Sequence, residues 1–295
     1  MKVDVLGVQI DAEPKHVLLE KVADGLKIGQ PLFLVTPYSE SLVAAQKDLE
    51  FKKVLNSADF SLPDGIGVLW AAHYLKAKTK NPKTKIWTLV QTLLSILFSP
   101  KSIRDPIPEK ISGSEFVWDL AELAAKNNYS IFLLGGFGDT AEKAANSLKT
   151  KFPNLRIAGT YSPSKNDVIA SEAKPVRPGS PGGQSRGDEI AAAGTTGLAM
   201  TDLIEQARPD FLLVALGPIR QEKWIAKNLP NLPIKLAIGL GGTFDYLAGK
   251  RRYRAHFWAQ RGLEWLWRLF TQPWRAGRIF KGIFGLIWYT AKSKY

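Results

Sequence analysis

The sequence predicts an α/β protein with a mostly parallel sheet, helices on both faces of that sheet, and a basic helical appendage at the C-terminal end. Short apolar runs alternate with stretches of helical periodicity through the first 250 residues. This alternation is typical of a parallel sheet that is covered on both faces. From about Lys250 onward the composition shifts to arginine and tryptophan, which marks the appendage.

Five apolar runs have the length and composition of buried strands. They are Val3–Val8, Leu32–Val35, Ile131–Leu134, Phe211–Ala215 and Leu236–Ile238. Other stretches carry apolar residues at helical spacing. The predicted helices are Ser41–Asn56, Ser114–Lys126, Thr140–Phe152, Arg220–Asn228 and Thr243–Ala248.

Two segments interrupt the alternation of strands and helices. We therefore predict a core over residues 1–249, with insertions at about 77–108 and 162–200, and an appendage over residues 250–295. Residues 162–200 are rich in proline and glycine and carry few large apolar side chains, which predicts a mobile loop or a disordered insertion.

The composition limits the classes of partner and chemistry. The 295 residues include 40 basic and 27 acidic side chains, for a formal charge of +13. This excess favours anionic partners such as phosphorylated substrates, acidic lipid headgroups or nucleic acid. The absence of cysteine excludes disulfides, thiolate zinc sites and cysteine nucleophiles, and it agrees with a reducing cytoplasm. The chain starts like a strand rather than a secretion signal, and its longest uncharged run, Ile86–Pro100, is shorter than the roughly 20 apolar residues that cross a bilayer.

Three predicted strands run into small-residue turns that precede helices. These turns are Gly135-Gly136, Gly217-Pro218 and Gly241-Gly242. Glycine lets the backbone approach a ligand, and free N–H groups at the start of a helix attract an anion. Together the three turns favour a nucleotide or nucleotide-sugar site at the carboxyl ends of the strands, although each turn alone is also explained as a helix cap. The Gly-Lys-Ser/Thr sequence of a P-loop is missing.

Asp64 is the candidate general base. It lies between Pro63 and Gly65 where an approaching strand ends, so its carboxylate is expected to face the cleft and to accept a proton from a sugar hydroxyl. Pro-Asp-Gly is also a common turn sequence, and a purely structural turn is the alternative. Asp-x-Asp, a frequent metal-binding pair, is absent, and the three histidines are scattered, so we expect neither a metal nor a cofactor.

Several motifs in order resemble the WecG/TagA/CpsF glycosyltransferase family. The matching pieces include Thr36-Pro37, Leu62-Pro-Asp-Gly-Ile-Gly-Val68, Ile111-Ser-Gly-Ser114, Gly217-Pro-x-x-Gln-Glu-Lys-Trp224 and Ile238-Gly-Leu-Gly-Gly-Thr-Phe-Asp245. The similarity extends from residue 1 to about residue 275, with interruptions at the two insertions.

The resemblance implies a Rossmann-like core and a metal-independent enzyme that inverts the anomeric carbon. It implies transfer of N-acetylmannosamine, or its uronic acid, from UDP to N-acetylglucosamine on a polyprenyl diphosphate, in the synthesis of cell-surface polysaccharide or teichoic acid. Asp64 matches the general base, and Thr36 matches the residue beside it. The residues predicted to contact the donor are Lys110, Gly135, Gly136, Gln221, Gly241, Gly242 and Asp245.

Two positions depart from the family pattern. Tyr38 follows Thr36-Pro37 where asparagine is usual, and Lys110 stands where arginine is usual. Lysine keeps the charge but loses the two-pronged geometry of a guanidinium group. A nucleotide-sugar or nucleic-acid binding protein without catalytic activity is therefore the alternative, and NAD(P)-dependent oxidation is a more distant one.

The tail carries arginines at a spacing of seven, from Arg254 through Arg261 and Arg268 to Arg275, and seven residues advance a helix by nearly two turns. Apolar residues at helical spacing accompany them, and Pro273 is expected to end this helix. Arginine can bind lipid phosphates and tryptophan suits the headgroup interface, so we predict that the tail contacts a membrane. We also predict that Arg251, Arg254 and Arg261 contact the acceptor diphosphate. A core-packing helix with a solvated face is the alternative, and nucleic acid is not expected because no recognised motif accompanies the stripe.

Residues 76–110 predict a second membrane contact. Thr88, Gln91, Thr92, Ser95 and Ser99 fall on one helical face, apolar residues cover the rest, and lysines precede the segment. We expect an interfacial helix on an anionic membrane, with a contact between identical chains or a local core as the alternatives. The protein is accordingly predicted to be cytoplasmic and peripheral on the inner face of the cell membrane.

Overall fold

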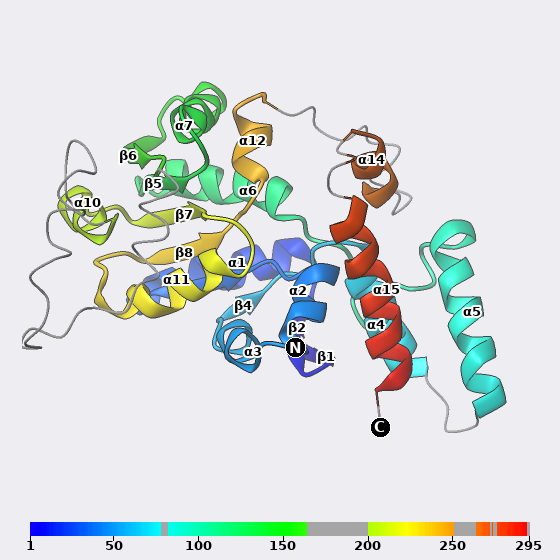
Figure 1. Cartoon of the computed structure of the whole chain (residues 1–295). Coiled ribbons are helices and arrows are strands. Elements are labelled where there is room, and N and C mark those ends of the chain that lie inside the picture. Colours follow the sequence, from blue (N-terminus) through cyan, green and yellow to red (C-terminus); the bar gives the residue numbers. More distant parts are fainter. Residues whose placement is uncertain (78–81, 164–199, 251–263, 272, 274–275, 294–295) are drawn as a thin grey trace, which may run out of the picture.

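The computed structural model describes residues 1–77, 82–163, 200–250, 264–271, 273 and 276–293. Its centre is a six-stranded sheet in the order β4-β3-β8-β7-β5-β6, in which every neighbouring pair is parallel (Figure 1). The strands are β3 (Leu32–Val35), β4 (Phe60–Ser61), β5 (Ser130–Gly135), β6 (Arg156–Tyr161), β7 (Phe211–Ala215) and β8 (Leu236–Gly239). The predicted parallel α/β sheet is confirmed.

Side chains that alternate along the strands divide the core between the two faces of the sheet. In β3, Phe33 and Val35 pack into one apolar cluster and Leu34 into the other. The first cluster is completed by α2 (Ser39–Ala45), α3 (Leu49–Asn56), α4 (Ile66–Ala77), α10 (Met200–Ala207) and α11 (Arg220–Asn228). The second is completed by α1 (Lys15–Ile28), α6 (Gly113–Lys126), α7 (Thr140–Lys151) and α12 (Thr243–Leu247).

Two predicted elements are each divided in the structure. The run Val3–Val8 is not one strand but the hairpin β1 (Lys2–Val5) and β2 (Val8–Asp11), because Leu6 and Gly7 have φ values of 59° and 81°. The predicted helix Ser41–Asn56 is divided into α2 and α3, since Asp48 accepts the backbone N–H of Phe51 at 2.9 Å and starts a new helix.

The prediction missed β6 and three helices, α1, α4 and α10. Strand β6 has a weak apolar pattern, and its Gly159 is required because a Cβ there would lie 2.7 Å from the ring of Phe132. A short 3₁₀ helix, η1 (Leu229–Asn231), follows α11.

Three further helices lie at one end of the molecule: α5 (Pro82–Phe98), α14 (Glu264–Thr271) and α15 (Ala276–Lys292) (Figure 1). The predicted break near Pro273 is confirmed, because α14 ends at Thr271 and α15 begins at Ala276. No described helix has both the length and the hydropathy that crossing a bilayer requires. Part of the tail prediction falls on residues 251–263, and the loop prediction falls mainly on residues 164–199. Both ranges lie outside the described residues.

Helix α15 packs closely against α2 and α4. Its Leu286 is buried in the first core cluster. Two glycines allow the close approach: a Cβ on Gly282 would lie 2.7 Å from Cγ of Glu40, and a Cβ on Gly285 would lie 3.0 Å from Val43. The C-terminal helix is thus joined to the core by a fitted surface rather than by its sequence connection alone.

This fit predicts opposite behaviour for two glycines of α15. Gly277→Ala should raise the free energy of unfolding by about 0.5–1 kcal/mol, because a Cβ at Gly277 meets nothing within 4 Å and alanine favours a helix. Gly282→Ala should gain none of this stability, because the new Cβ would displace the side chain of Glu40. Urea denaturation of both variants tests the difference, and equal stabilisation of the two would contradict the packing argument.

Candidate active site

A cleft of about 420 Å³ opens at the carboxyl ends of the four adjacent strands β4, β3, β8 and β7. Each of these strands is followed by residues that line it. Asp64 follows β4, Thr36 follows β3, Gly241 and Gly242 follow β8, and Pro218 follows β7. Parallel strands place their carboxyl ends on one edge, which explains why residues far apart in the sequence meet there.

Thr36 is held between β8 and the start of α6. Its Oγ1 donates to the carbonyl oxygen of Gly239 at 3.3 Å. Gly113 packs so closely that a Cβ on it would lie 3.3 Å from Cγ2 of Thr36. Ser112 and Ser114, whose hydroxyl oxygens are 2.9 Å apart, also line the cleft. The N-terminal end of α6 therefore forms part of the wall, and helix N-termini favour anions.

Asp64 is half-buried on a turn that backbone hydrogen bonds hold at two positions. Its backbone N–H donates to the carbonyl oxygen of Pro37 at 3.1 Å. The N–H of Ile111 donates to the carbonyl oxygen of Pro63 at 2.9 Å. Gly65 has a φ of 101°, which a residue with a side chain rarely adopts. Asp64 therefore belongs to a turn and also lines the cleft.

Gln221 joins α11 to the turn after β8. Its Oε1 accepts the backbone N–H of Gly241 at 2.9 Å, and its Nε2 donates to Oε1 of Glu222 at 2.8 Å. Gly239 is required beneath it, because a Cβ there would lie 2.7 Å from Nε2 of Gln221. This contact places the glutamine so that it fixes the shape of the Gly241-Gly242 turn.

Glu222 is a buried acid in the wall of the cleft. The sequence motif from Gly217 to Trp224 contains it, but no site role was predicted for it. Its Oε1 accepts from Gln221, whereas no hydrogen-bond partner reaches its Oε2 within the described residues. Burial raises the pKa of the Glu222 carboxyl group above its ordinary value, because the charged form loses its hydration.

Arg278 brings a positive charge from α15 into the cleft. Its Nε donates to Oε2 of Glu40 at 2.6 Å, and its NH2 donates to the hydroxyl of Tyr38 at 3.3 Å. Tyr38, the departure from the family pattern, is therefore one of the groups that hold this arginine. Sequence reasoning missed Arg278, because the seven-residue spacing of the tail arginines ends at Arg275.

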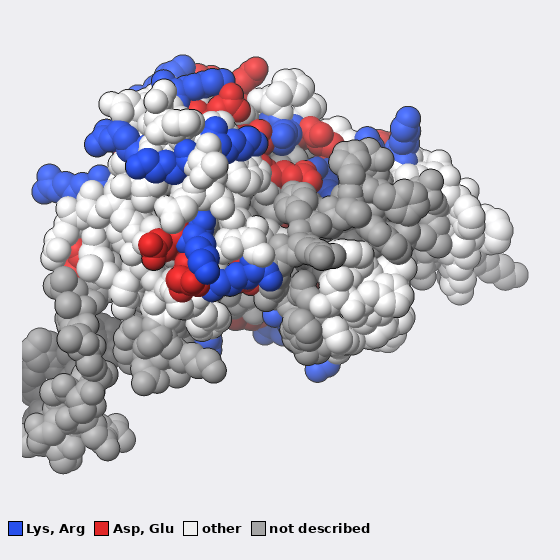
Figure 2. Space-filling model, turned by 90° about the horizontal axis from the view of Figure 1, so that it is seen from above, with Lys and Arg blue, Asp and Glu red and all other residues white. Residues whose placement is uncertain are grey.

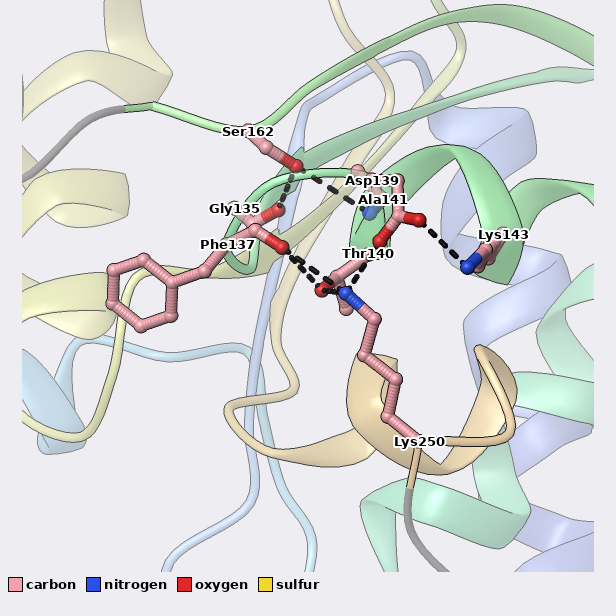
Figure 3. Close-up of polar contacts among 8 residues, drawn as sticks. All are labelled: Gly135, Phe137, Asp139, Thr140, Ala141, Lys143, Ser162 and Lys250. Carbon is pink, nitrogen blue, oxygen red and sulfur yellow. Dashed lines mark hydrogen bonds and ion pairs between the residues drawn. The ribbon is translucent and has the colours of Figure 1, made fainter.

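The Gly135-Gly136 turn lies outside the lining of the cleft and makes contacts of its own (Figure 3). The hydroxyl of Ser162 donates to the carbonyl oxygen of Gly135 at 3.1 Å. Nζ of Lys250 donates to Oγ1 of Thr140 at 2.8 Å and pairs with Asp139. Hydrogen bonds from Lys143 and Lys250 lower the pKa of Asp139 to about 2. The segment after the turn thus anchors Lys250, the last residue described before position 264 (Figure 3).

The structure divides the predicted site residues into three groups. Those that line the cleft are Thr36, Asp64, Gln221, Gly241 and Gly242. Those that are described but do not line it are Lys110, Gly135, Gly136 and Asp245. Those outside the described residues are Arg251, Arg254 and Arg261. In the part of the chain that is described, no three acidic or histidine side chains gather as a metal site.

Comparison with known proteins gives one family for nearly the whole chain. The family described as "Glycosyl transferase WecG/TagA/CpsF family" matches residues 3–104 and 94–295. A relative from Bacillus subtilis (strain 168) is 29% identical over 262 residues, which cover 88% of this chain and 79% of the relative. A relative from Staphylococcus aureus (strain MRSA252) is 24% identical over 295 residues, which cover 99% of this chain and 93% of the relative. Both are N-acetylglucosaminyldiphosphoundecaprenol N-acetyl-beta-D-mannosaminyltransferases.

The buried acid predicts a pH-dependent stability that Glu222→Gln should remove. The folded protein holds the Glu222 proton to higher pH than the unfolded chain does, so the wild type should lose stability as pH rises above the ordinary glutamate pKa. Glutamine does not titrate, and the variant should therefore gain stability relative to the wild type between pH 5 and pH 8. Urea denaturation at both pH values measures this gain, and an equal difference at the two pH values would contradict the raised pKa of Glu222.

Proposed function

The chain belongs to the WecG/TagA/CpsF glycosyltransferase family, and from this premise we propose that it transfers N-acetylmannosamine, or its uronic acid, from UDP to N-acetylglucosamine on a polyprenyl diphosphate. The product would enter cell-surface polysaccharide or teichoic acid synthesis. The names of the two relatives support the transferred sugar and the lipid-linked acceptor. The observation that carries the proposal is the single cleft that Asp64, Thr36 and the Gly241-Gly242 turn line together.

In the proposed reaction Asp64 takes the proton of the acceptor hydroxyl as that oxygen attacks the anomeric carbon of the donor. The bond between this carbon and the UDP oxygen breaks on the opposite face, so the configuration inverts and UDP leaves with the bonding electrons. General-base help of this kind contributes about 10²–10⁴-fold in rate. Thr36 lies beside the reacting groups, and its hydroxyl is oriented by the carbonyl oxygen of Gly239.

The leaving diphosphate develops negative charge that the site must stabilise. Arg278 and the N-terminal end of α6 are the positively charged parts of the cleft wall among the residues described. Gln221 contributes by holding the N–H of Gly241 in place. The other predicted donor contacts, Lys110, Gly135, Gly136 and Asp245, lie beyond the lining of this cleft.

Asp64→Asn tests the role of the carboxylate. We expect turnover of UDP-N-acetylmannosamine with a short-chain lipid acceptor to fall by at least about 100-fold, because asparagine cannot accept the proton. The dissociation constant for UDP, measured by calorimetry, should stay unchanged. Asp24→Asn, at an exposed surface ion pair, is the matched control and should retain full activity.

Three results would separate the alternatives. Wild-type protein that binds UDP-sugar without turnover favours a binding protein that has lost catalysis. Turnover that survives Asp64→Asn removes the carboxylate from the mechanism. Binding of NAD(P) in place of UDP favours an oxidoreductase.

We also propose that the protein attaches to the inner face of the cell membrane through the outer face of α5. This face comprises Ile86, Trp87, Val90, Leu94 and Phe98, all of which are exposed. Among the residues that Figure 2 colours, those in the right-hand part of the view, where α5 lies in Figure 1, include few charged side chains, which supports the proposal. Tryptophan and phenylalanine suit the interface between headgroups and acyl chains.

One residue of the predicted polar face of α5 is buried. Thr92, which shares that face with Gln91 and Ser95 in the prediction, lies in the interior, and its Oγ1 accepts the indole N–H of Trp70 at 3.1 Å. Of the lysines in the predicted basic flank, Lys76 pairs with Asp105. Lys78 and Lys80 lie outside the described residues. The apolar outer face is therefore the principal membrane contact in this proposal.

A double substitution on α5 tests the membrane contact. Trp87→Ser with Phe98→Ser should lower the partition coefficient onto anionic vesicles by about tenfold or more, because two exposed side chains lose the gain from burial in lipid. Ile28→Ser, which removes an exposed apolar side chain from α1, is the control and should bind as the wild type does. Co-sedimentation with vesicles measures both, and equal binding of all three proteins would exclude α5 as the contact.

A further inference from the structure

The cleft that holds Asp64 has one wall with little polar character. This wall is formed by Leu93 and Ile96 of α5 and by Phe280, Ile283, Phe284 and Ile287 of α15. The rings of Phe280 and Phe284 stack with their centroids 6.0 Å apart and their planes inclined by 22°. Apart from the face of its base, a nucleotide sugar is polar, and so is an amino-sugar acceptor head; neither accounts for an apolar wall made by side chains of two helices.

The chemical character of the cleft changes along α15. Arg278 lies in the first turn of the helix, and the apolar side chains follow it up to Ile287, a distance of about 14 Å at 1.5 Å per residue. One cavity therefore contains three parts: a polar end with Asp64 and Thr36, the cation of Arg278, and the apolar wall. A lipid-linked sugar contains the same three parts, which are a sugar, a diphosphate and a prenyl chain.

We infer that the wall between α5 and α15 is a binding subsite for the first isoprene units of the acceptor's lipid chain. This inference rests on the proposed acceptor, and it adds the part of the protein that recognises the chain rather than the head. Burial of apolar surface is the interaction that selects such a ligand.

The two apolar faces of α5 support this occupant. Leu89, Leu93 and Ile96 face the core and the cleft, whereas Trp87, Leu94 and Phe98 are turned outward. A helix that is apolar on both sides needs a second apolar neighbour. With the membrane on its outer side, α5 separates the bilayer from the cleft, and a prenyl chain passes between α5 and α15 without crossing water.

Two exposed aromatic residues of α15 give a matched test. Phe284 and Trp288 are 64% and 62% exposed, and Phe284 lines the cleft whereas Trp288 does not. The probes are two water-soluble esters of N-acetylglucosamine diphosphate, one with a chain of two isoprene units and one with a methyl group. The donor is UDP-N-acetylmannosamine, and no membrane is present.

We expect the wild-type KM to be lower for the isoprenyl ester by about tenfold or more, as burial of several methyl and methylene groups predicts. Phe284→Ser should remove most of this preference by raising KM for the isoprenyl ester alone. Trp288→Ser should keep it. Because both side chains are exposed, the variants should unfold at the urea concentration of the wild type.

The outcomes separate this subsite from the function on which it rests. Equal KM values for the two esters in the wild type, or an unchanged preference in Phe284→Ser, would overturn the subsite while the transferase stands. The same loss of preference in Trp288→Ser would overturn it also, because that residue lies outside the cleft. If neither ester is turned over with UDP-N-acetylmannosamine or with its uronic acid as donor, the proposed function is overturned, and the subsite with it.

Discussion

The parallel pairing of β3 with β8 is the constraint on which the rest of the site depends. Leu34 pairs with Ile238 in register, so the residues after both strands emerge at the same height. Thr36 then reaches the carbonyl oxygen of Gly239, and Gly241 reaches the side chain of Gln221. The contact between Thr36 and Gly239 joins segments more than 200 residues apart in the sequence. A shift of the strand register would therefore separate the candidate base from the turn that faces it.

The second determinant is the fit of α15 on the core. Gly282 and Gly285 let this helix approach α2. Arg278, at the start of α15, pairs with Glu40 of α2. The pair places a positive charge in the cleft without leaving it uncompensated when the site is empty. The C-terminal helix therefore has both a packing role and an electrostatic one, and Tyr38 contributes to the second.

Polar and apolar requirements are divided between different parts of the cleft. The sheet edge supplies carboxylate, hydroxyl and glycine backbone groups, whereas α5 and α15 supply aliphatic and aromatic surface. Glu222 lies in the polar part, where its burial raises its pKa. The proposed reaction, which would join a sugar from a water-soluble donor to a lipid-linked acceptor, requires this division because its two substrates differ in polarity.

Much of the fold was predictable from the sequence alone. Apolar runs such as Phe211–Ala215 and helical periodicity such as Arg220–Asn228 are local signals, and both elements have these bounds in the structure. The motifs around Asp64, Gln221 and Gly241 were also local, and these residues line one cleft. Strand β6 was missed because its glycine and polar residues leave only a weak apolar pattern, and its close packing depends on Gly159 against the ring of Phe132.

Only the tertiary structure decided which residues meet. Nothing in the sequence around Arg278 indicates that it pairs with Glu40, since a contact over 238 positions leaves no periodic signal. Gly135 and Gly241 look alike in the sequence, yet only Gly241 lines the cleft, because the order of the strands sets the distance of each turn from β3. Local patterns determine which helices and strands form, and the pairing of distant strands determines which of their ends become a site.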